Sequence, residues 1–415
     1  MIITLVTDQF YTSSHGTSVS AQRLYQGLVD QGHTVRVLAI DNGEHTPYAI
    51  KERSFGKFAD KVIHSQGFQL AKPDKEVIKK AIIGADVVHV YMPFALGRKT
   101  AEMCSKMNIP CTAAAHIVPE NITSTLHLNK SKLINNLLWK RWYRTTYRYV
   151  DNIHCPSNIV ANQLEKHNFY ANKHIISNGY NDAYKMNREE KPAIYKDKFV
   201  IVVNGRMSRE KRFDIIINAV NKSKYRDKIL LIFGGKGPLK NRLVNMAKKL
   251  PNTPVFLGAY NRQQQLSFLN FADLYVHSAD VEVEGMTCLE AIACGCVPLV
   301  SDSPKSATSQ FAVHSNSVFE HGNYYDLANK IDWWIEHPDE LQAQHEVVVE
   351  HAKNFTVERS MNAYVKMFEQ TVAEHKKACK LVNSPDLITE DLLDEELLEY
   401  YSSDDNQEEL VEHRI

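Results

Sequence analysis

Short apolar runs alternate with helical stretches through the first half of the chain. The apolar runs are 2–7, 34–40, 87–91, 111–115 and 152–155. The stretches between them repeat apolar residues at helical spacing, as at Leu24 and Leu28. Buried strands that alternate with helices are typical of a parallel sheet covered by helices on both faces. The first half is therefore predicted to form one such sheet, with its ligands at the carboxyl ends of the strands.

A second series of the same kind begins at residue 199. Its predicted strands are 199–204, 229–233, 255–257, 274–277 and a short apolar strand in the stretch that runs to Val300. Its predicted helices are 214–221, 239–250, 262–270 and one that contains Glu290. A turn-rich stretch and a polar stretch, 175–182 and 185–198, separate the two series. We therefore predict an α/β protein with two doubly wound, Rossmann-like domains, 1–182 and 197–350.

The last part of the chain is predicted to be helical and then disordered. Amphipathic spacing predicts helices at 325–336 and 357–380, and we assign 351–382 to a C-terminal helix. Residues 383–415 hold 12 acids and one base, so an acidic, disordered tail is expected there. The net charge of zero for the whole chain therefore conceals a charge of +11 in residues 1–382.

Composition narrows the class of protein. No apolar run resembles a transmembrane span, and the first residues lack the basic region and long apolar core of a signal peptide. Seven scattered cysteines include no Cys-x-x-Cys pair, so we expect reduced thiols in the cytoplasm, without disulfides or zinc. The basic body suits an anionic partner such as a membrane surface, and no nucleic-acid partner is expected.

Candidate chemistry begins in the loop before the predicted helix of Glu290. This loop carries Glu282, Glu284 and Gly285, and the N–H groups at Met286 and Thr287 lie at the helix N-terminus. Such N–H groups attract anions, while carboxylates accept hydrogen bonds from hydroxyls. A nucleotide-sugar offers both phosphates and hydroxyls. The alternative is a capped core helix with solvated acids.

Two cations follow the predicted strand 199–204. Arg206 and Lys211 should emerge at the same sheet edge as the Glu282 loop, where they could hold a diphosphate. The alternative for these cations is a surface ion pair with Glu210 or Asp214.

Taken together, these motifs resemble the retaining glycosyltransferases of family 4, which have the GT-B fold. The motifs are, in order, Gly205-Arg206-Met207-x-x-Glu210-Lys211, Gly235-x-Gly237-Pro238 and Glu282-x7-Glu290-Ala291-x-Ala293-x-Gly295-x-x-Pro298. Each is weak alone, but the order and spacing make the set strong. The resemblance extends to about Lys380 and implies a C-terminal helix that returns to the N-terminal domain.

The resemblance implies a role for each motif residue in binding the donor. Arg206 and Lys211 would bind the diphosphate, assisted by N–H groups near Met286 and Thr287. Glu290 would bind the ribose hydroxyls and Glu282 the transferred sugar.

The first domain would contribute Gly16, in a loop that approaches the donor, and His116, near the sugar. For His116 an ordinary packed histidine is the alternative, and its neighbour His89 is expected to be structural.

Three positions depart from the family pattern. His15 stands where a glycine is usual before Gly16, and Arg212 stands where a glycine usually follows the lysine. Glu284 replaces a frequent phenylalanine and has no assigned role.

The implied reaction is retaining transfer of a hexose without metal or cofactor, with UDP-glucose as the expected donor. The cations Arg206 and Lys211 would replace a metal ion.

The acceptor is expected to be a membrane lipid. A basic helical stretch, 130–149, carries Trp139 and Trp142 together with the cations Lys140, Arg141 and Arg144. Tryptophans and cations on one helix suit the interface of an anionic membrane, and the alternative is a core helix with a solvated basic face. The preceding stretch, 116–122, resembles bacterial diacylglycerol glucosyltransferases, so 1,2-diacylglycerol is the favoured acceptor.

These features predict a peripheral enzyme at the inner face of the cell membrane. One alternative is a soluble family 4 enzyme that acts on a polysaccharide, a glycoprotein or a small molecule. Another is a catalytically silent partner protein that keeps the fold.

Overall fold

The computed structural model describes residues 1–383 except 12–15, 42–46, 66–67, 125–127 and 129–130. The chain divides into two compact units, 1–368 and 369–415, and both sheets lie in the first. The predicted acidic tail and His15 lie outside the described residues, apart from Asn383.

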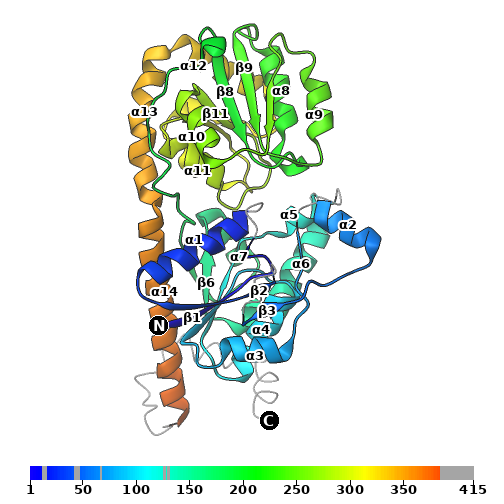
Figure 1. The fold of residues 1–415 in the computed structure, drawn as a ribbon, viewed down its shortest axis with the longest axis vertical. Coiled ribbons are helices and arrows are strands. Elements are labelled where there is room, and N and C mark those ends of the chain that lie inside the picture. The colour runs from blue at the N-terminus through cyan, green and yellow to red at the C-terminus, as the bar shows by residue number, and fades with distance from the viewer. Residues whose placement is uncertain (12–15, 42–46, 66–67, 125–127, 129–130, 384–415) are drawn as a thin grey trace. The chain divides into compact units, whose positions relative to one another are not determined.

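A parallel sheet of seven strands forms what we call the first domain (Figure 1). Its strands are β1 (Ile2–Val6), β2 (Thr34–Ile40), β3 (Ala49–Ile50), β4 (Val87–Val90), β5 (Cys111–Ala114), β6 (Asn152–Cys155) and β7 (Asn172–Ile175), in the order β3-β2-β1-β4-β5-β6-β7. Its helices are α1 (Gly16–Asp30), α2 (Lys57–Ser65), α3 (Lys75–Ile82), α4 (Ala95–Lys106), α5 (Pro119–Thr123), α6 (Lys132–Thr145) and α7 (Asn158–Lys166). Five strands were predicted, while the short β3 and the half-exposed β7 were not.

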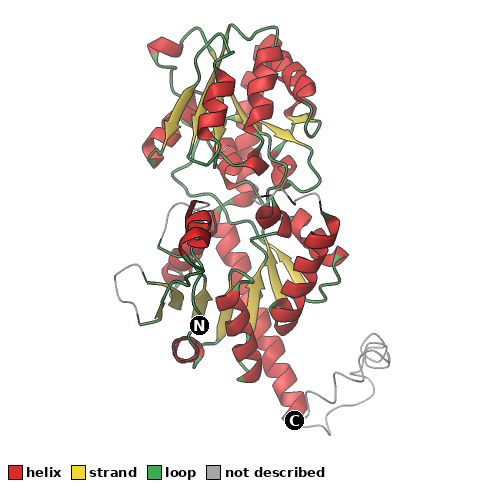
Figure 2. Cartoon of the chain, turned by 90° about the vertical axis from the view of Figure 1, so that its right-hand side faces the viewer, coloured by secondary structure: helices red, strands yellow, loops and turns green. Residues whose placement is uncertain are grey.

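The second domain contains a parallel sheet of six strands. They are β8 (Phe199–Asn204), β9 (Ile229–Gly234), β10 (Val255–Gly258), β11 (Leu274–His277), β12 (Val297–Ser301) and β13 (Val318–Phe319), in the order β10-β9-β8-β11-β12-β13. Its helices are α8 (Phe213–Lys222), α9 (Lys240–Ala247), α10 (Arg262–Phe271), α11 (Met286–Ala293), α12 (Tyr324–Glu336) and α13 (Pro338–Ala352). The prediction of two parallel, helix-covered sheets is therefore confirmed (Figure 2).

Alternation along the central strand β8 builds two apolar cores. Ile201 and Val203 pack on the face covered by α8, α9 and α12. Val200 and Val202 pack on the opposite face, which α10, α11 and α13 cover. Because strand side chains point to opposite faces in turn, a fully apolar strand such as β8 serves both cores.

The carboxyl end of β8 meets the turn after β9 at two glycines. Gly205 has a φ of +145° and Gly235 one of +117°. A Cβ built on Gly235 would lie 2.1 Å from the Gly205 carbonyl oxygen. Only glycine permits this approach, which brings the Arg206 segment and the Gly235–Pro238 turn together at one sheet edge.

The last element of the described residues is a long helix, α14 (Val357–Asn383). The predicted helix 351–382 is interrupted, because a 3₁₀ turn at Lys353–Phe355 separates α13 from α14. Within the 1–368 unit, α14 returns to the first domain: the Tyr364 hydroxyl lies 2.9 Å from Nδ1 of His154 on β6. The implied C-terminal helix of the GT-B fold is thus observed.

The seven cysteines form no disulfide, and six of them are buried. Burial raises the pKa of the Cys155 and Cys294 thiols to about 12. The half-buried Cys379 lies on α14.

Candidate active site

Glu282, on the loop that follows β11, is paired with Lys211. The ammonium group of Lys211 donates to Oε2 of Glu282, and His277 Nε2 lies 3.1 Å from the same oxygen. Burial raises the pKa of Glu282, but Lys211 and His277 outweigh burial and lower it to about 2. The carboxylate is therefore ionised at neutral pH. His277 was not a sequence candidate, although it ends a predicted strand at the same sheet edge.

Main-chain hydrogen bonds fix the path of the Glu282 loop. The Glu282 N–H donates to the Lys305 carbonyl at 3.0 Å, and the Glu282 carbonyl accepts from Ala307 N–H at 2.9 Å. Gly285 then turns with a φ of +97°, and a Cβ there would lie 2.4 Å from Thr308 Cγ2. A glycine is therefore required immediately before α11.

The first turn of α11 is attached to the end of β8. The Thr287 hydroxyl donates to the Asn204 carbonyl at 3.2 Å and accepts from the Tyr275 hydroxyl at 2.8 Å. Gly16 lies beside the same turn, because a Cβ on Gly16 would be 3.6 Å from Met286 Sδ. The predicted residues Gly16, Met286 and Thr287 thus lie together.

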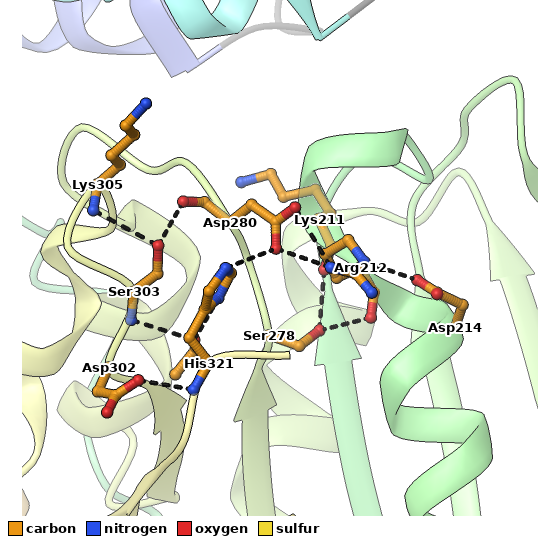
Figure 3. A network of polar contacts seen from close by, with 10 residues as sticks. Lys211, Arg212, Asp214, Ser278, Asp280, Asp302, Ser303, Lys305 and His321 are labelled. Carbon is orange, nitrogen blue, oxygen red and sulfur yellow. Dashed lines mark hydrogen bonds and ion pairs between the residues drawn. The ribbon is translucent and has the colours of Figure 1, made fainter. Parts of the chain in front are cut away.

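The turn that carries Lys211 is held by the segment after β11 (Figure 3). The Ser278 hydroxyl contacts the carbonyl oxygens of Lys211 and Arg212 at 2.8 and 3.0 Å. Arg212 has a φ of +51°, in the left-handed region that favours glycine, and its guanidinium pairs with Asp280 at 3.0 Å and Asp214 at 3.3 Å. The position where the family usually has glycine therefore keeps a glycine-like backbone, and two ion pairs offset its strain.

Arg206 follows Gly205 at the carboxyl end of β8. Burial lowers the pKa of Arg206, and the nearby Glu210 carboxylate opposes this effect. Glu210 itself accepts from the Ser208 hydroxyl. The alternative of a surface ion pair with Glu210 or Asp214 does not apply to Lys211, which pairs with the inner Glu282.

Glu290, on α11, is buried with both carboxylate oxygens engaged. Arg23 of α1 donates to Oε1 at 2.8 Å, and Gln265 of α10 donates to Oε2 at 2.9 Å. Sequence reasoning missed both partners, because nothing in their local pattern distinguishes them from other polar residues on helix surfaces. The expected role of Glu290 toward ribose stays a prediction.

His116 lies after β5 in a cluster of buried histidines. Its ring stacks on Tyr91 at 5.0 Å and meets the His154 ring edge-on at 4.9 Å. Burial lowers its pKa well below the usual range, so the ring is neutral. Within the described part of the chain, its Nε2 is buried without a hydrogen-bond partner. His89 hydrogen-bonds Thr112 in the core, in agreement with its expected structural role.

The two tryptophans of α6 do not lie at the surface. Trp139 and Trp142 are 2% and 4% exposed and contact each other, and Trp139 also packs on His167 and Phe169. The expectation that their rings enter a membrane is therefore corrected, because these rings fill the core of the first domain.

The exposed face of α6 combines leucines with cations. Leu133 and Leu137, one helical turn apart, are 73% and 59% exposed. The cations on this exposed face are Lys132, Lys140, Arg141 and Arg144. We call these six residues the α6 face. The sequence predicted the helix and its charges, but the membrane contact was assigned to Trp139 and Trp142, which lie on the buried side of the helix.

The described residues contain neither a helix suited to span a membrane nor a group suited to hold a metal ion. None of the described helices is long and apolar enough to cross a bilayer. Across the same residues, no group of three or more His, Cys, Asp or Glu side chains is arranged to hold a metal ion.

Two family models match adjoining parts of the chain. The model described as Glycosyltransferase Family 4 matches residues 14–184, and the one described as Glycosyl transferases group 1 matches residues 185–354. With the two parallel sheets, these matches show that the chain belongs to the family 4 glycosyltransferases of GT-B fold. It is a hexosyltransferase.

Named relatives cover most of the chain. It is 25% identical over 324 residues to an alpha-monoglucosyldiacylglycerol synthase of Streptococcus pneumoniae, covering 73% of this chain and 72% of the relative. It is 23% identical over 320 residues to the enzyme of that name from Acholeplasma laidlawii, covering 71% and 78%. The structure of Anabaena HepE in complex with UDP-glucose aligns with a TM-score of 0.63 and 16% identity, over 91% of this chain and 100% of HepE. This last likeness concerns the fold alone.

Proposed function

We propose that the protein transfers glucose from UDP-glucose, with retention and without a metal ion or cofactor, to a membrane lipid such as 1,2-diacylglycerol. The observation that carries the proposal is the ionised Glu282 beside Lys211, at the sheet edge where α11 begins. The two relatives named as alpha-monoglucosyldiacylglycerol synthases support the lipid acceptor. HepE, which shares the fold, is itself described in complex with UDP-glucose, the donor that we propose here.

In this proposal the protein supplies charge and position. Lys211 and Arg206 bind the diphosphate and stabilise it as it leaves, with the α11 N–H groups beside them. Departure of UDP leaves an oxocarbenium-like sugar, which the Glu282 carboxylate stabilises electrostatically. The leaving phosphate oxygen accepts the proton of the acceptor hydroxyl on the same face, so the new bond forms with retention. His116 stays the proposed contact near the sugar.

We propose that the enzyme binds the membrane through the α6 face and reaches its lipid acceptor there. Exposed Leu133 and Leu137 can enter the headgroup region, and the cations beside them attract anionic lipid. This arrangement replaces the tryptophan anchor predicted from the sequence. We therefore propose that the enzyme binds peripherally at the inner face of the cell membrane.

A donor and acceptor assay tests the proposed reaction. Purified protein is incubated with radiolabelled UDP-glucose and vesicles of phosphatidylglycerol and phosphatidylcholine, with or without dioleoylglycerol. We expect released UDP and an α-linked glucosyldiacylglycerol, identified by NMR, in the presence of EDTA. Lys211→Ala and Glu282→Ala should each lower kcat/KM by at least about 100-fold. Turnover only with a soluble acceptor would favour the soluble alternative, and none with any donor would favour the silent partner.

A sedimentation assay tests the α6 face separately. Leu133→Asp/Leu137→Asp should remove binding to anionic vesicles, while hydrolysis of the donor in solution continues. Unchanged sedimentation of this double variant would contradict the membrane role of the α6 face.

A further inference from the structure

The donor-site loop is held by hydrogen bonds from outside the second domain. Within the 1–368 unit, the Val283 carbonyl accepts from the Ser157 hydroxyl at 2.7 Å. The Glu284 carboxylate accepts from the Ser177 hydroxyl at 2.5 Å and from the Asn178 N–H at 2.9 Å. Its second oxygen accepts from the Asn178 side-chain amide. Two consecutive loop residues are thus fixed by the first domain and by the segment that joins the two domains.

The orientation of the Asn178 amide is itself determined. The Glu284 carboxylate accepts from Nδ2 of this amide, and its Oδ1 then accepts from the Ser20 hydroxyl of α1 at 2.5 Å. Glu284 is 1% exposed. Burial raises the pKa of Glu284 to about 7, against the lowering effect of these hydrogen bonds and of Arg23. A buried carboxylate whose direct partners are uncharged depends on every one of those hydrogen bonds.

Glu284 is not placed to touch a substrate. Both oxygens are occupied by Ser177 and Asn178. Its position in the chain matters instead, because it lies two residues after Glu282 and immediately before Gly285, where the chain turns into α11. A shift of Glu284 therefore moves Glu282 and the first turn of α11 together.

We propose that Glu284 is a positioning residue. Through Ser177 and Asn178 it holds the 282–287 loop, and with it the Glu282 carboxylate and the α11 N-terminus, in the conformation that binds the donor. The inference rests on the proposed function only for the identity of that ligand.

A reciprocal exchange of hydrogen-bonding groups tests this role. In Glu284→Gln, an amide N–H can face the N–H of the Asn178 side chain, so two donors meet. In Asn178→Asp, two carboxylates face each other, so two acceptors meet. The double variant Glu284→Gln/Asn178→Asp restores one N–H···O hydrogen bond with donor and acceptor exchanged. We expect each single variant to bind UDP at least about tenfold more weakly in calorimetry, and the double variant to recover most of the affinity.

Hydrogen–deuterium exchange of the ligand-free protein gives a second readout. The 281–290 peptide should exchange faster in each single variant and return toward wild-type rates in the double variant. The matched control is Asp332→Asn on α12, another buried carboxylate that accepts from a serine hydroxyl, Ser223, and a main-chain N–H, that of Lys224. It should lower Tm while leaving UDP affinity and the 281–290 exchange unchanged.

The outcomes separate this inference from the proposed reaction. Unchanged exchange of the 281–290 peptide in Glu284→Gln, or a double variant no better than its worse parent, would overturn the positioning role. If wild-type protein binds no UDP, the proposed donor is wrong, while the exchange experiment still decides whether Glu284 holds the loop.

Discussion

Three carboxylates within one short stretch have three different environments. Glu282 faces a lysine, Glu290 faces an arginine and a glutamine, and Glu284 faces uncharged donors. The proximity of Glu282 and Lys211 was predictable, because the carboxyl ends of parallel strands meet at one edge. The partners of Glu284 were not, because they lie more than 100 residues away in the sequence, at 177 and 178. No periodic pattern encodes that contact.

Removal of Lys211 should destabilise the protein in a pH-dependent way. The pKa of Glu282 is lowered to about 2, so the stability from its ionisation is present above its ordinary pKa and is lost as pH falls toward 2. Lys211→Met should lower the free energy of unfolding by about 3 kcal/mol at pH 7, and by less at pH 3. Urea unfolding at both pH values measures this. The control Lys106→Met removes an exposed partner of Glu102 and should change little, and an equal loss there would contradict the argument.

The buried histidines should make the protein sensitive to acid. Burial lowers the pKa of His154 to about 4, so the unfolded chain binds its proton first as pH falls below about 6.5. Stability from the neutral ring is present above that pH and decreases by about 2 kcal/mol between pH 7 and 5. The difference in unfolding free energy between pH 7 and 5 should therefore be smaller in His154→Gln than in wild type. An equal difference in the two proteins would contradict this assignment.

At the scale of elements, α6 shows what helical spacing does and does not predict. The spacing indicates a helix and places apolar residues along it, and that helix is observed. It does not determine which apolar side chains face the core, because apolar residues lie on both sides of this helix, with tryptophans on one side and Leu133 and Leu137 on the other. The structure packs the larger rings inside, where they bury more area, and leaves Leu133 and Leu137 outside.

Truncation of a tryptophan in α6 should therefore affect stability. Trp142→Ala should lower the free energy of unfolding by about 3–5 kcal/mol, because it leaves a cavity beside Trp139. Leu137→Ala, on the same helix but 59% exposed, should stay within about 0.5 kcal/mol of wild type. Chemical denaturation of both variants measures the contrast. Similar losses in the two would contradict the observed orientation of α6.

At the scale of the whole molecule, the alternation of strands and helices was sufficient to predict two parallel sheets. It was not sufficient to predict the structure of the joining segment at 177–180, because that structure depends on contacts with α1, α14 and the Glu284 loop. Arg23 donates to the Gly179 carbonyl, and Tyr180 pairs with Thr356 at the start of α14. Such contacts between distant segments leave no local signal in a sequence.

Gly179 should be the most sensitive point of this joining segment. It has a φ of +70°, and a Cβ there would lie 2.8 Å from Val357 Cα. Gly32 has a similar φ of +80°, but open space surrounds the position of its Cβ. Gly32→Ala should cost only the backbone strain, about 1 kcal/mol, whereas Gly179→Ala should cost clearly more. Thermal unfolding compares the two, and equal shifts in Tm would show that the contact with Val357 is unimportant.

The distribution of thiols has a practical consequence for experiments on this protein. Six cysteines are buried, where a reagent in solution does not reach them, and burial raises the pKa of the Cys155 and Cys294 thiols to about 12. A maleimide dye should therefore attach to the wild-type chain at Cys379 alone, without prior removal of other cysteines. A fluorophore on this part of α14 would give a single-site optical reporter.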